Sequence, residues 1–178
     1  MKIRPAEPDD FPAIKAVARQ TWHDTYDELE DDLIDRTVDN WYTDDSMPLR
    51  APGTVVLVVE ADPRAADESG MRDGEDSEDG ENGEIVGFTH AVAQGETADI
   101  LRMYVKPDAQ GDGVGTDLHE RLVEQLEVYD VDRIRSIDFA FNDTSRRFYE
   151  GLGFEQTNTG EVEIDGNYYD EAVYTLEL

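Results

Sequence analysis

The stretch that decides the fold is residues 98–116, ADILRMYVKPDAQGDGVGT. It begins with a run rich in apolar residues, Ala98 to Val105, that is typical of a strand and that Lys106-Pro107 would end. A loop with glycines at alternate positions follows, from Gln110 to Thr116. The apolar residues after it recur at helical spacing: Val114, Leu118, Leu122 and Leu126. The stretch therefore predicts a strand, a glycine-rich loop and the start of a helix.

The glycine loop is suited to binding an anion. Glycines let the backbone turn tightly and approach a ligand closely, while free N–H groups and the helix dipole favour a pyrophosphate. Two better-known phosphate loops do not match. G-x-G-x-x-G would need glycine at Thr116 or Leu118, and G-x-x-x-x-G-K-[ST] would need a lysine that this loop lacks. What remains is Q-x-x-G-x-G at Gln110, Gly113 and Gly115, with a plain glycine-rich turn as the alternative.

Strand-like and helix-like segments alternate along the rest of the chain. The expected strands are 2–4, 54–60, 84–92, 98–105, 134–141 and two from Phe154 onward, which Asp165-Gly166 would join as a hairpin. The expected helices are one from Asp9 or Asp10 through Trp22, one around 33–41, the one after the glycine loop, and a short one at 144–151. This order indicates an α/β fold around one mixed sheet.

Residues 61–83 differ from these segments because they hold many acidic residues, several glycines and almost nothing apolar. We interpret them as a solvated, mobile insertion between two strands. The chain length suits one domain that spans residues 1–178 and carries this insertion.

The charge of the chain is strongly one-sided, with 44 Asp and Glu against 15 Lys and Arg, a net of −29. Such a composition fits either a disordered acidic protein or a folded protein adapted to concentrated salt. The periodic apolar segments favour the folded, halophilic protein. At molar salt the Debye length shrinks to ~3 Å, which screens the repulsion of an acidic surface.

The composition also excludes several functions. Nucleic acid and anionic membranes are unsuitable partners, because both bind basic surfaces. The absence of cysteine excludes disulfides, thiolate metal sites and a cysteine nucleophile. No metal site is expected, since the three histidines are scattered and the acidic residues show no ligand spacing. No membrane-length apolar run and no signal-peptide core is visible, so we expect a cytoplasmic protein.

A second motif, NDTSRRFYEGLGF at residues 142–154, follows the glycine loop. The two motifs together resemble the GNAT acetyltransferases, in which Q/R-x-x-G-x-G/A precedes N-x-x-A-x-x-F-Y-E-x-L-G-F. Here Ser145 replaces the usual alanine. The chain ends, IRPAEPDDFPAI and YYDEAVYTLEL, are also similar to the family, as is the W-x-x-x-Y pair Trp22 and Tyr26 to one subgroup. The resemblance implies a mostly antiparallel sheet of about seven strands flanked by about four helices.

The resemblance implies acetyl-coenzyme A as the acyl donor. The backbone amides of the glycine loop would hold its pyrophosphate: Gln110, Gly111, Asp112, Gly113, Val114, Gly115 and Thr116. The family splays its fourth and fifth strands, so Met103, Tyr104 and Val105 would pair with the pantetheine arm. A backbone N–H near Tyr104 would stabilise the oxyanion. Asn142 would either contact the cofactor or cap the helix that follows it.

By the same resemblance, Tyr149 would be the general acid, since a phenol with a pKa of about 10 can protonate a thiolate; packing in the core is its alternative role. The base stays open. Asp99 occupies the position of a glutamate that some relatives use, and Glu96, His90 and a water chain are alternatives. Four aromatic residues would either line the acceptor pocket or pack in the core: Trp22, Tyr26, Trp41 and Tyr42.

The predicted function is transfer of an acetyl group to the amine of a small molecule or of a peptide or protein N-terminus, by direct attack in a ternary complex. The alternative is a non-catalytic domain that binds or senses acyl-coenzyme A. Tyr149, Asn142 and the complete glycine loop favour catalysis, because a mere binder has no need of Tyr149. A different acyl chain and a homodimer both stay open.

Overall fold

The computed structural model of the chain describes residues 1–26, 29–43, 45–61, 83–111 and 113–178. Apart from its end residues Ala61 and Gly83, the acidic insertion expected at 61–83 therefore lies outside the described residues, as does Asp112 of the glycine loop.

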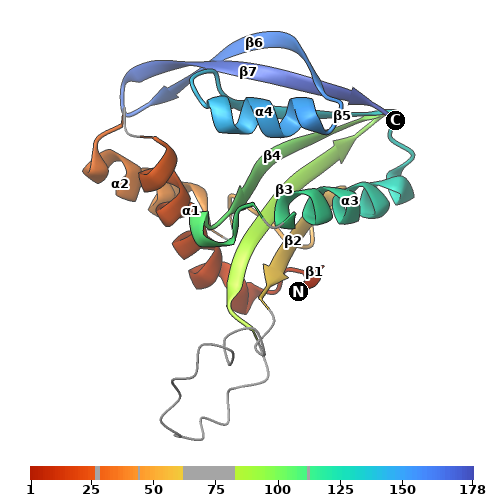
Figure 1. Cartoon of the computed structure of the whole chain (residues 1–178), viewed down its shortest axis with the longest axis horizontal. Helices are drawn as coiled ribbons and strands as arrows, with labels where there is room; N and C mark the ends of the chain where they lie inside the picture. Colours follow the sequence, from red (N-terminus) through yellow and green to blue (C-terminus); the bar gives the residue numbers. More distant parts are fainter. Residues whose placement is uncertain (27–28, 44, 62–82, 112) are drawn as a thin grey trace, which may run out of the picture.

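The strands form one sheet of seven in the order β1-β2-β3-β4-β5-β7-β6 (Figure 1). All neighbouring strands are antiparallel except β4 and β5, which run parallel. The expected mixed, mostly antiparallel sheet is thus confirmed. Its strands are β1 (Lys2–Pro5), β2 (Thr54–Glu60), β3 (Ile85–Gln94), β4 (Thr97–Val105), β5 (Arg133–Phe139), β6 (Glu155–Ile164) and β7 (Asn167–Glu177).

In the described part of the chain, four α-helices cover the sheet: α1 (Phe11–Thr25), α2 (Asp31–Trp41), α3 (Val114–Leu126) and α4 (Asp143–Gly151). Single 3₁₀ turns lie at η1 (Pro8–Asp10), η3 (Pro107–Ala109) and η4 (Glu127–Tyr129). Figure 1 shows α1 and α2 together on one side of the sheet and α3 and α4 on the other. Within the described ranges, no helix combines the length and the apolar character that crossing a membrane would require.

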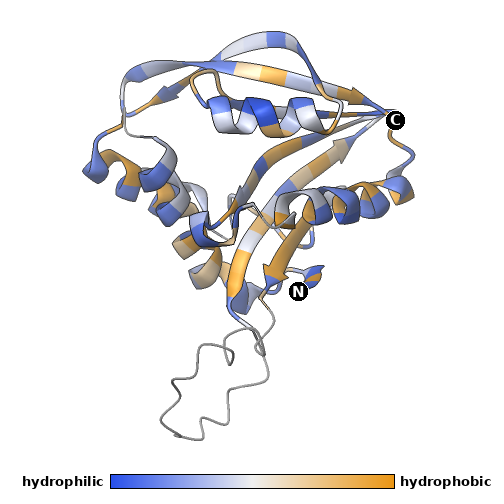
Figure 2. Ribbon diagram, in the orientation of Figure 1, coloured by the Kyte–Doolittle hydropathy of each residue, from blue (hydrophilic) through white to orange (hydrophobic). Residues whose placement is uncertain are grey.

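The core has two halves because both faces of the sheet are covered. Along β2, Val56 and Val58 pack with α1 and α2, whereas Val55, Leu57 and Val59 pack with α3. This alternation follows from the two-residue period of a strand. It explains why the segment TVVLVVE is apolar at successive positions, which Figure 2 shows as an almost continuous orange strand.

Two further elements agree with the predictions made from local sequence signals. The apolar stripe of α3 is buried at all four predicted positions: Val114, Leu118, Leu122 and Leu126. In the turn between β6 and β7, Asp165 and Gly166 both have positive φ, at 53° and 82°. Two consecutive positive φ angles are the mark of a tight hairpin turn that Asp-Gly favours.

The parallel pair β4 and β5 separates part of the way along its length. The two strands are paired only from Thr97 to Ile100 and from Arg133 to Ser136. Beyond these residues β4 continues to Val105 and β5 to Phe139 without pairing to each other. A register shift between His90 and Ala91 bends the β3–β4 pair at the same level. The sheet therefore opens between its fourth and fifth strands, as the resemblance implied.

Candidate active site

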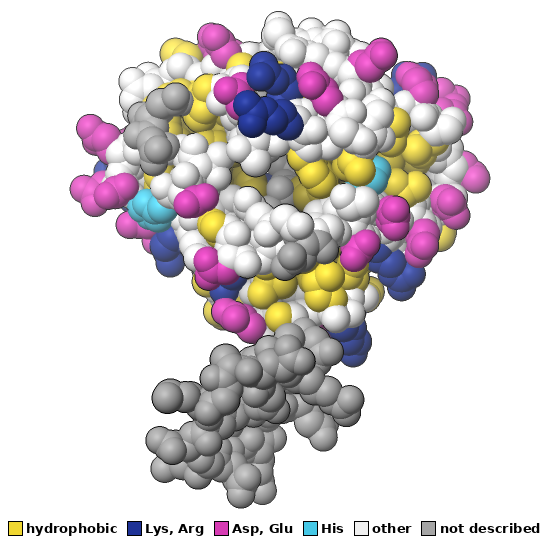
Figure 3. All heavy atoms as spheres, in the orientation of Figure 1, with side chains coloured by type: hydrophobic (Ala, Val, Ile, Leu, Met, Phe, Trp, Pro, Cys, Tyr) yellow, Lys and Arg dark blue, Asp and Glu magenta, His cyan; other side chains and the backbone are white. Residues whose placement is uncertain are grey.

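A cavity of about 350 Å³ lies beside this opening, with walls from α1, the end of β4, the glycine loop, the first turn of α3 and α4. Figure 3 shows the molecular surface hollowed below α4. The structure brings nearly all of the predicted site residues to this one cavity: Met103, Tyr104, Val105, Gln110, Gly111, Gly113, Val114, Gly115, Thr116, Asn142 and Tyr149. Asp112 lies outside the described residues, and Asp99 is not among those that line the cavity.

The start of α3 presents free backbone donors to the cavity. Gly113 is the N-cap residue, with a left-handed conformation at φ 82° and ψ 8°. The first helical bond closes from Asp117 N to Gly113 O at 3.0 Å. The N–H groups of Val114, Gly115 and Thr116 consequently have no partner within the helix, and all three residues line the cavity. The site therefore combines N–H donors with the positive end of the helix dipole.

The glycines of the loop serve different purposes. A Cβ added to Gly113 would meet no protein atom within 4 Å. The positive φ of Gly113 nevertheless disfavours any residue with a side chain. A Cβ on Gly115 would lie 2.9 Å from Cε2 of Phe148, so the first turn of α3 packs directly against α4. The Gln110 side chain ties the loop to β4, because its Nε2 donates to the Val105 carbonyl at 2.9 Å.

The edge of β4 that faces the opening carries the backbone groups of Met103 and Val105. The Lys106 N–H donates to the Val86 carbonyl of β3 at 2.7 Å, whereas the Val105 carbonyl points away from β3 toward Gln110. Since backbone groups alternate sides along an antiparallel strand, Met103 also faces the opening and Tyr104 faces β3. The oxyanion donor that we expect near Tyr104 would therefore be the backbone N–H of Met103 or that of Val105, since these two point toward the opening.

Asn142 both caps α4 and lines the cavity. Its Oδ1 accepts from the Ser145 N–H at 3.1 Å, which satisfies a free donor of the first helical turn. Its Nδ2 donates to the Tyr26 hydroxyl at 3.2 Å and lies 3.4 Å from the Asp138 carboxylate. The side-chain amide is thus fixed in one orientation at the cavity wall.

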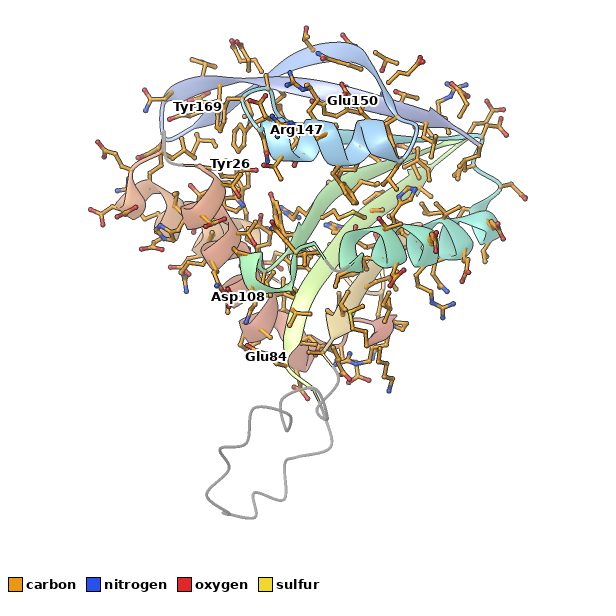
Figure 4. All side chains as sticks on the ribbon, in the orientation of Figure 1. Tyr26, Glu84, Asp108, Arg147, Glu150 and Tyr169 are labelled. Atoms are coloured by element: carbon orange, nitrogen blue, oxygen red, sulfur yellow. The ribbon has the colours of Figure 1, made fainter. Side chains whose placement is uncertain are left out.

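Asp138 is an important residue that sequence reasoning did not single out. Its carboxylate accepts from the Tyr26 hydroxyl at 3.1 Å and from the Phe139 N–H at 2.8 Å. Burial raises the pKa of Asp138, and its hydrogen bonds act against that shift. The available signal was an acidic residue between two apolar residues, Ile137 and Phe139, at the end of strand β5. Figure 4 shows Tyr26, the residue that follows α1, near the beginning of α4, and these hydrogen bonds connect it to β5.

Tyr149 is a buried residue that lines the cavity. Only 3% of the residue is exposed, and its ring stacks on Tyr174 with centroids 5.8 Å apart. Burial raises the pKa of Tyr149 well above its usual range, and the charge of Asp138 raises it further. The phenol consequently stays protonated at neutral pH, which is the form that a general acid requires.

The residues weighed as bases do not line the cavity. Asp99 lies on the paired part of β4, and Arg135 holds its two carboxylate oxygens at 2.7 and 2.9 Å. Glu96 is exposed in the turn before β4. His90 is buried on β3, where its Nδ1 lies 3.0 Å from Arg102 Nη1. The structure therefore brings none of these three side chains to Tyr149.

The aromatic residues of α1 and α2 mainly build the core. Trp22, Tyr26 and Tyr42 are at most 1% exposed, and Trp41 is half-buried. The ring of Trp22 meets those of Tyr26 and Trp41 edge to face, with centroids 5.1 and 5.5 Å apart. The wall that α1 gives to the cavity consists instead of Thr21 and Thr25.

Comparison with known proteins identifies related sequences and folds. Residues 75–156 match the family model described as acetyltransferase (GNAT) domain. The PaiA N-acetyltransferase of Thermoplasma acidophilum, solved in complex with coenzyme A, is 18% identical with a TM-score of 0.74, over 99% of this chain and 98% of that one. A GCN5-related N-acetyltransferase of Rhodopseudomonas palustris is 20% identical, with a TM-score of 0.69 over 99% and 95%.

A ribosomal-protein-alanine N-acetyltransferase of Brucella melitensis is also similar in fold, with 20% identity and a TM-score of 0.61 over the whole of both chains. No curated protein sequence gives a significant match. At these identities the structural likeness establishes the fold, while the sequence match covers both motifs as far as Gln156.

Proposed function

We propose that this chain, of which residues 75–156 match the GNAT acetyltransferase domain model, transfers an acetyl group from acetyl-coenzyme A to an amine of a small molecule or of a peptide or protein N-terminus. The observation that carries the proposal is one continuous cavity that joins the free N–H groups of α3 to the buried phenol of Tyr149. An anion site at one wall and a proton donor at another are what a phosphorylated thioester donor requires.

The residues of the cavity fit coenzyme A. The N–H groups of residues 114–116 would bind the pyrophosphate at the positive end of α3. The outward-facing backbone groups of Met103 and Val105 would pair with the amides of the pantetheine arm, much as an added strand pairs with a sheet edge. The coenzyme A complex of the Thermoplasma relative supports this use of the fold.

The proposed reaction is direct attack of a neutral amine on the thioester carbonyl carbon. The new C–N bond forms while the N–H of Met103 or Val105 stabilises the charge on the carbonyl oxygen. The C–S bond then breaks, and Tyr149 gives its proton to the leaving sulfur. The nitrogen loses one proton to water, and Tyr149 regains one from water, so protons balance without a side-chain base.

Amine-dependent thiol release tests this function. The protein in molar KCl is mixed with acetyl-coenzyme A and a panel of amines and N-terminal peptides, and free thiol and acetylated product are measured. We expect thiol release that depends on one class of amine. The product should be about 42 Da heavier than that amine, because an acetyl group replaces one of its hydrogens. Tight binding of acetyl-coenzyme A without release by any amine would instead favour a non-catalytic binding domain.

A further inference from the structure

Arg102 is a half-buried cation whose hydrogen-bond partner is neutral. Its guanidinium carbon lies 4.8 Å from the centre of the Tyr42 ring, and its Nη1 lies 3.0 Å from His90 Nδ1. Burial lowers the pKa of His90 to about 4, and the charge of Arg102 contributes to the shift. The imidazole is therefore uncharged at pH 7 and accepts a hydrogen bond from the guanidinium. Such a partner leaves the positive charge of Arg102 uncompensated.

Most other arginines of the described chain are paired with carboxylates, although Arg147 has no such pair among the described residues. Arg4 contacts both Asp10 and Glu60, and Arg135 contacts Asp99. Pairing is expected in a chain where 44 acidic residues face 15 basic ones. Among the described residues, no carboxylate lies within ion-pair distance of Arg102. Because partial burial makes a charge costly without a counter-charge, this half-buried site is suited to an anionic group from a ligand.

Further donors surround Arg102. Within the described part of the chain, the buried indole N–H of Trp22 and the buried hydroxyl of Tyr42 have no hydrogen-bond partner. Burial raises the pKa of Tyr42, while Arg102, Tyr104 and Trp22 act to lower it, so these groups lie close to its hydroxyl oxygen. An indole N–H and a guanidinium can only donate. The cluster of Trp22, Tyr42 and Arg102 is therefore rich in donors and carries a positive charge.

The donor cluster is adjacent in the chain to residues that line the cavity, but Arg102, Trp22 and Tyr42 are not themselves among the lining residues. Arg102 immediately precedes Met103 and Tyr104, which line the cavity from β4, and Trp22 follows Thr21, which lines it from α1. The cluster lies on the α1–α2 side of the sheet, while the glycine loop leads into α3 on the other side. Side chains alternate along a strand, so Arg102 and Tyr104 share one face of β4, and an acceptor bound against Tyr104 on this face would lie on the same side of the sheet as Arg102.

We propose that Arg102 binds a carboxylate of the amine acceptor, so that the acceptor is an amine with a carboxylate close to it, as in an amino acid. This inference rests on the proposed acetyl transfer. The acidic surface does not oppose it, because exposed carboxylates act through water and salt, whereas Arg102 acts at contact distance in a less polarisable surrounding.

Three acceptors with one side chain test the proposal: an amino acid, its amide, and the amine that lacks the carboxyl group. The amine of the amide resembles a peptide α-amine with a pKa of about 8, and the alkylamine resembles lysine at about 10. The amino acid lies between them in basicity, so a preference for it over both cannot come from amine protonation. The series is repeated with an apolar, a basic and an acidic side chain.

The same kcat/KM values are measured for wild type, Arg102→Met, Arg102→Lys and the control Arg121→Met. Methionine keeps an unbranched chain over Tyr42 but removes the charge. Arg121 is an exposed arginine of α3 whose contact is with Glu124, away from the cavity. We expect Arg102→Met to lower kcat/KM for the amino acid by about 10- to 100-fold, the contribution of a charge-assisted hydrogen bond. The values for the amide and the alkylamine should change little.

Loss of the preference in Arg102→Met, with its retention in Arg121→Met and partial retention in Arg102→Lys, would establish the proposal. A wild type that treats the amino acid no better than its amide and amine would overturn it, even if Arg102→Met failed to fold. Persistence of the preference in a folded Arg102→Met would also overturn it. Absence of thiol release with every amine would refute the proposed acetyl transfer itself, and the acceptor assignment with it.

Discussion

The hydroxyl of Tyr26 donates a hydrogen bond of 3.1 Å to the carboxylate of Asp138, which lies 112 positions later in the chain. The same hydroxyl accepts from Asn142 Nδ2 at 3.2 Å. The C-terminal end of α1, the unpaired end of β5 and the cap of α4 are thus joined by one set of hydrogen bonds. Two of these elements, α1 and α4, form walls of the proposed active site, so its shape depends on a contact between distant parts of the sequence.

Tyr26→Phe should destabilise the fold. The change removes one donor from the Asp138 carboxylate and the acceptor of an Asn142 N–H, and buried groups left without partners cost about 1–3 kcal/mol. Urea unfolding in molar KCl measures the free energy of unfolding. Tyr168→Phe is the matched control, because Tyr168 is 64% exposed and should lie within about 0.5 kcal/mol of wild type. Equal stability of the two variants would contradict the role of the Tyr26 hydroxyl.

Tyr149→Phe should lower turnover by ~10²- to 10⁴-fold, the usual contribution of a positioned general acid. Acetyl-coenzyme A affinity and melting temperature should change little, since the ring packing is retained. The control is Tyr174→Phe, which removes a hydroxyl from the ring stacked on Tyr149 but outside the lining of the cavity. Similar turnover in both variants, close to that of wild type, would leave Tyr149 with a packing role alone.

Gly113→Val should sharply weaken coenzyme A binding in calorimetry. A β-branched residue disfavours the φ of 82° at Gly113, and this backbone conformation holds the first turn of α3, whose N–H groups line the cavity. Gly166→Val is the control, because Gly166 in the β6–β7 turn has the same φ of 82° and a Cβ there would also have open space around it. It should therefore reproduce the backbone strain and leave coenzyme A affinity intact. Unchanged affinity in Gly113→Val would exclude the proposed pyrophosphate site.

His90 should make the fold less stable in acid. Burial lowers its pKa in the folded state to about 4, whereas an unfolded chain titrates near 6.5. Between these values the unfolded state binds a proton that the folded state does not, so the free energy of unfolding falls as the pH falls from 6.5 toward 4. The full loss at pH 4 is roughly 3 kcal/mol.

Comparison with His90→Gln isolates this effect, because the carboxylates and the second buried histidine, His119, titrate equally in both proteins. The difference in free energy of unfolding between wild type and variant should shrink or reverse between pH 7 and pH 4.5. A difference that stays constant over this range would show that His90 is accessible to protons in the folded protein.

Salt should raise the melting temperature. The excess acidic side chains, which give a net charge of −29, repel one another in dilute buffer. Salt screens this repulsion, because the Debye length falls from ~10 Å at 0.1 M salt to ~3 Å at 1 M. Surface ion pairs such as Arg36–Asp165 weaken in salt, but each contributes little to the free energy of unfolding. A melting series in KCl at pH 7 measures the effect, which should become small near the isoelectric point of about 4.1. A flat series at pH 7 would contradict the halophilic interpretation.

The sequence by itself determined the elements whose signals are local. The strand–loop–helix of 98–116 and the apolar stripe of α3 follow from residue periodicity, and the β6–β7 turn follows from Asp165-Gly166. Each signal depends on residues a few positions apart, so it can be read without knowing the fold. The second motif, with Asn142 and Tyr149, was identified instead by its resemblance to the GNAT acetyltransferases, and both residues lie at the cavity.

Only the tertiary structure decided which side chains meet. Asp99 and Asp138 are both acidic residues of strands, yet Asp99 lies beside Arg135 where β4 and β5 are paired, and Asp138 lies beside Tyr26 where they have separated. Arg102 likewise became significant only when its neighbour proved to be the uncharged His90. The reason is physical: the charge state and partner of a side chain depend on burial and on strand pairing between distant segments, which no local period encodes.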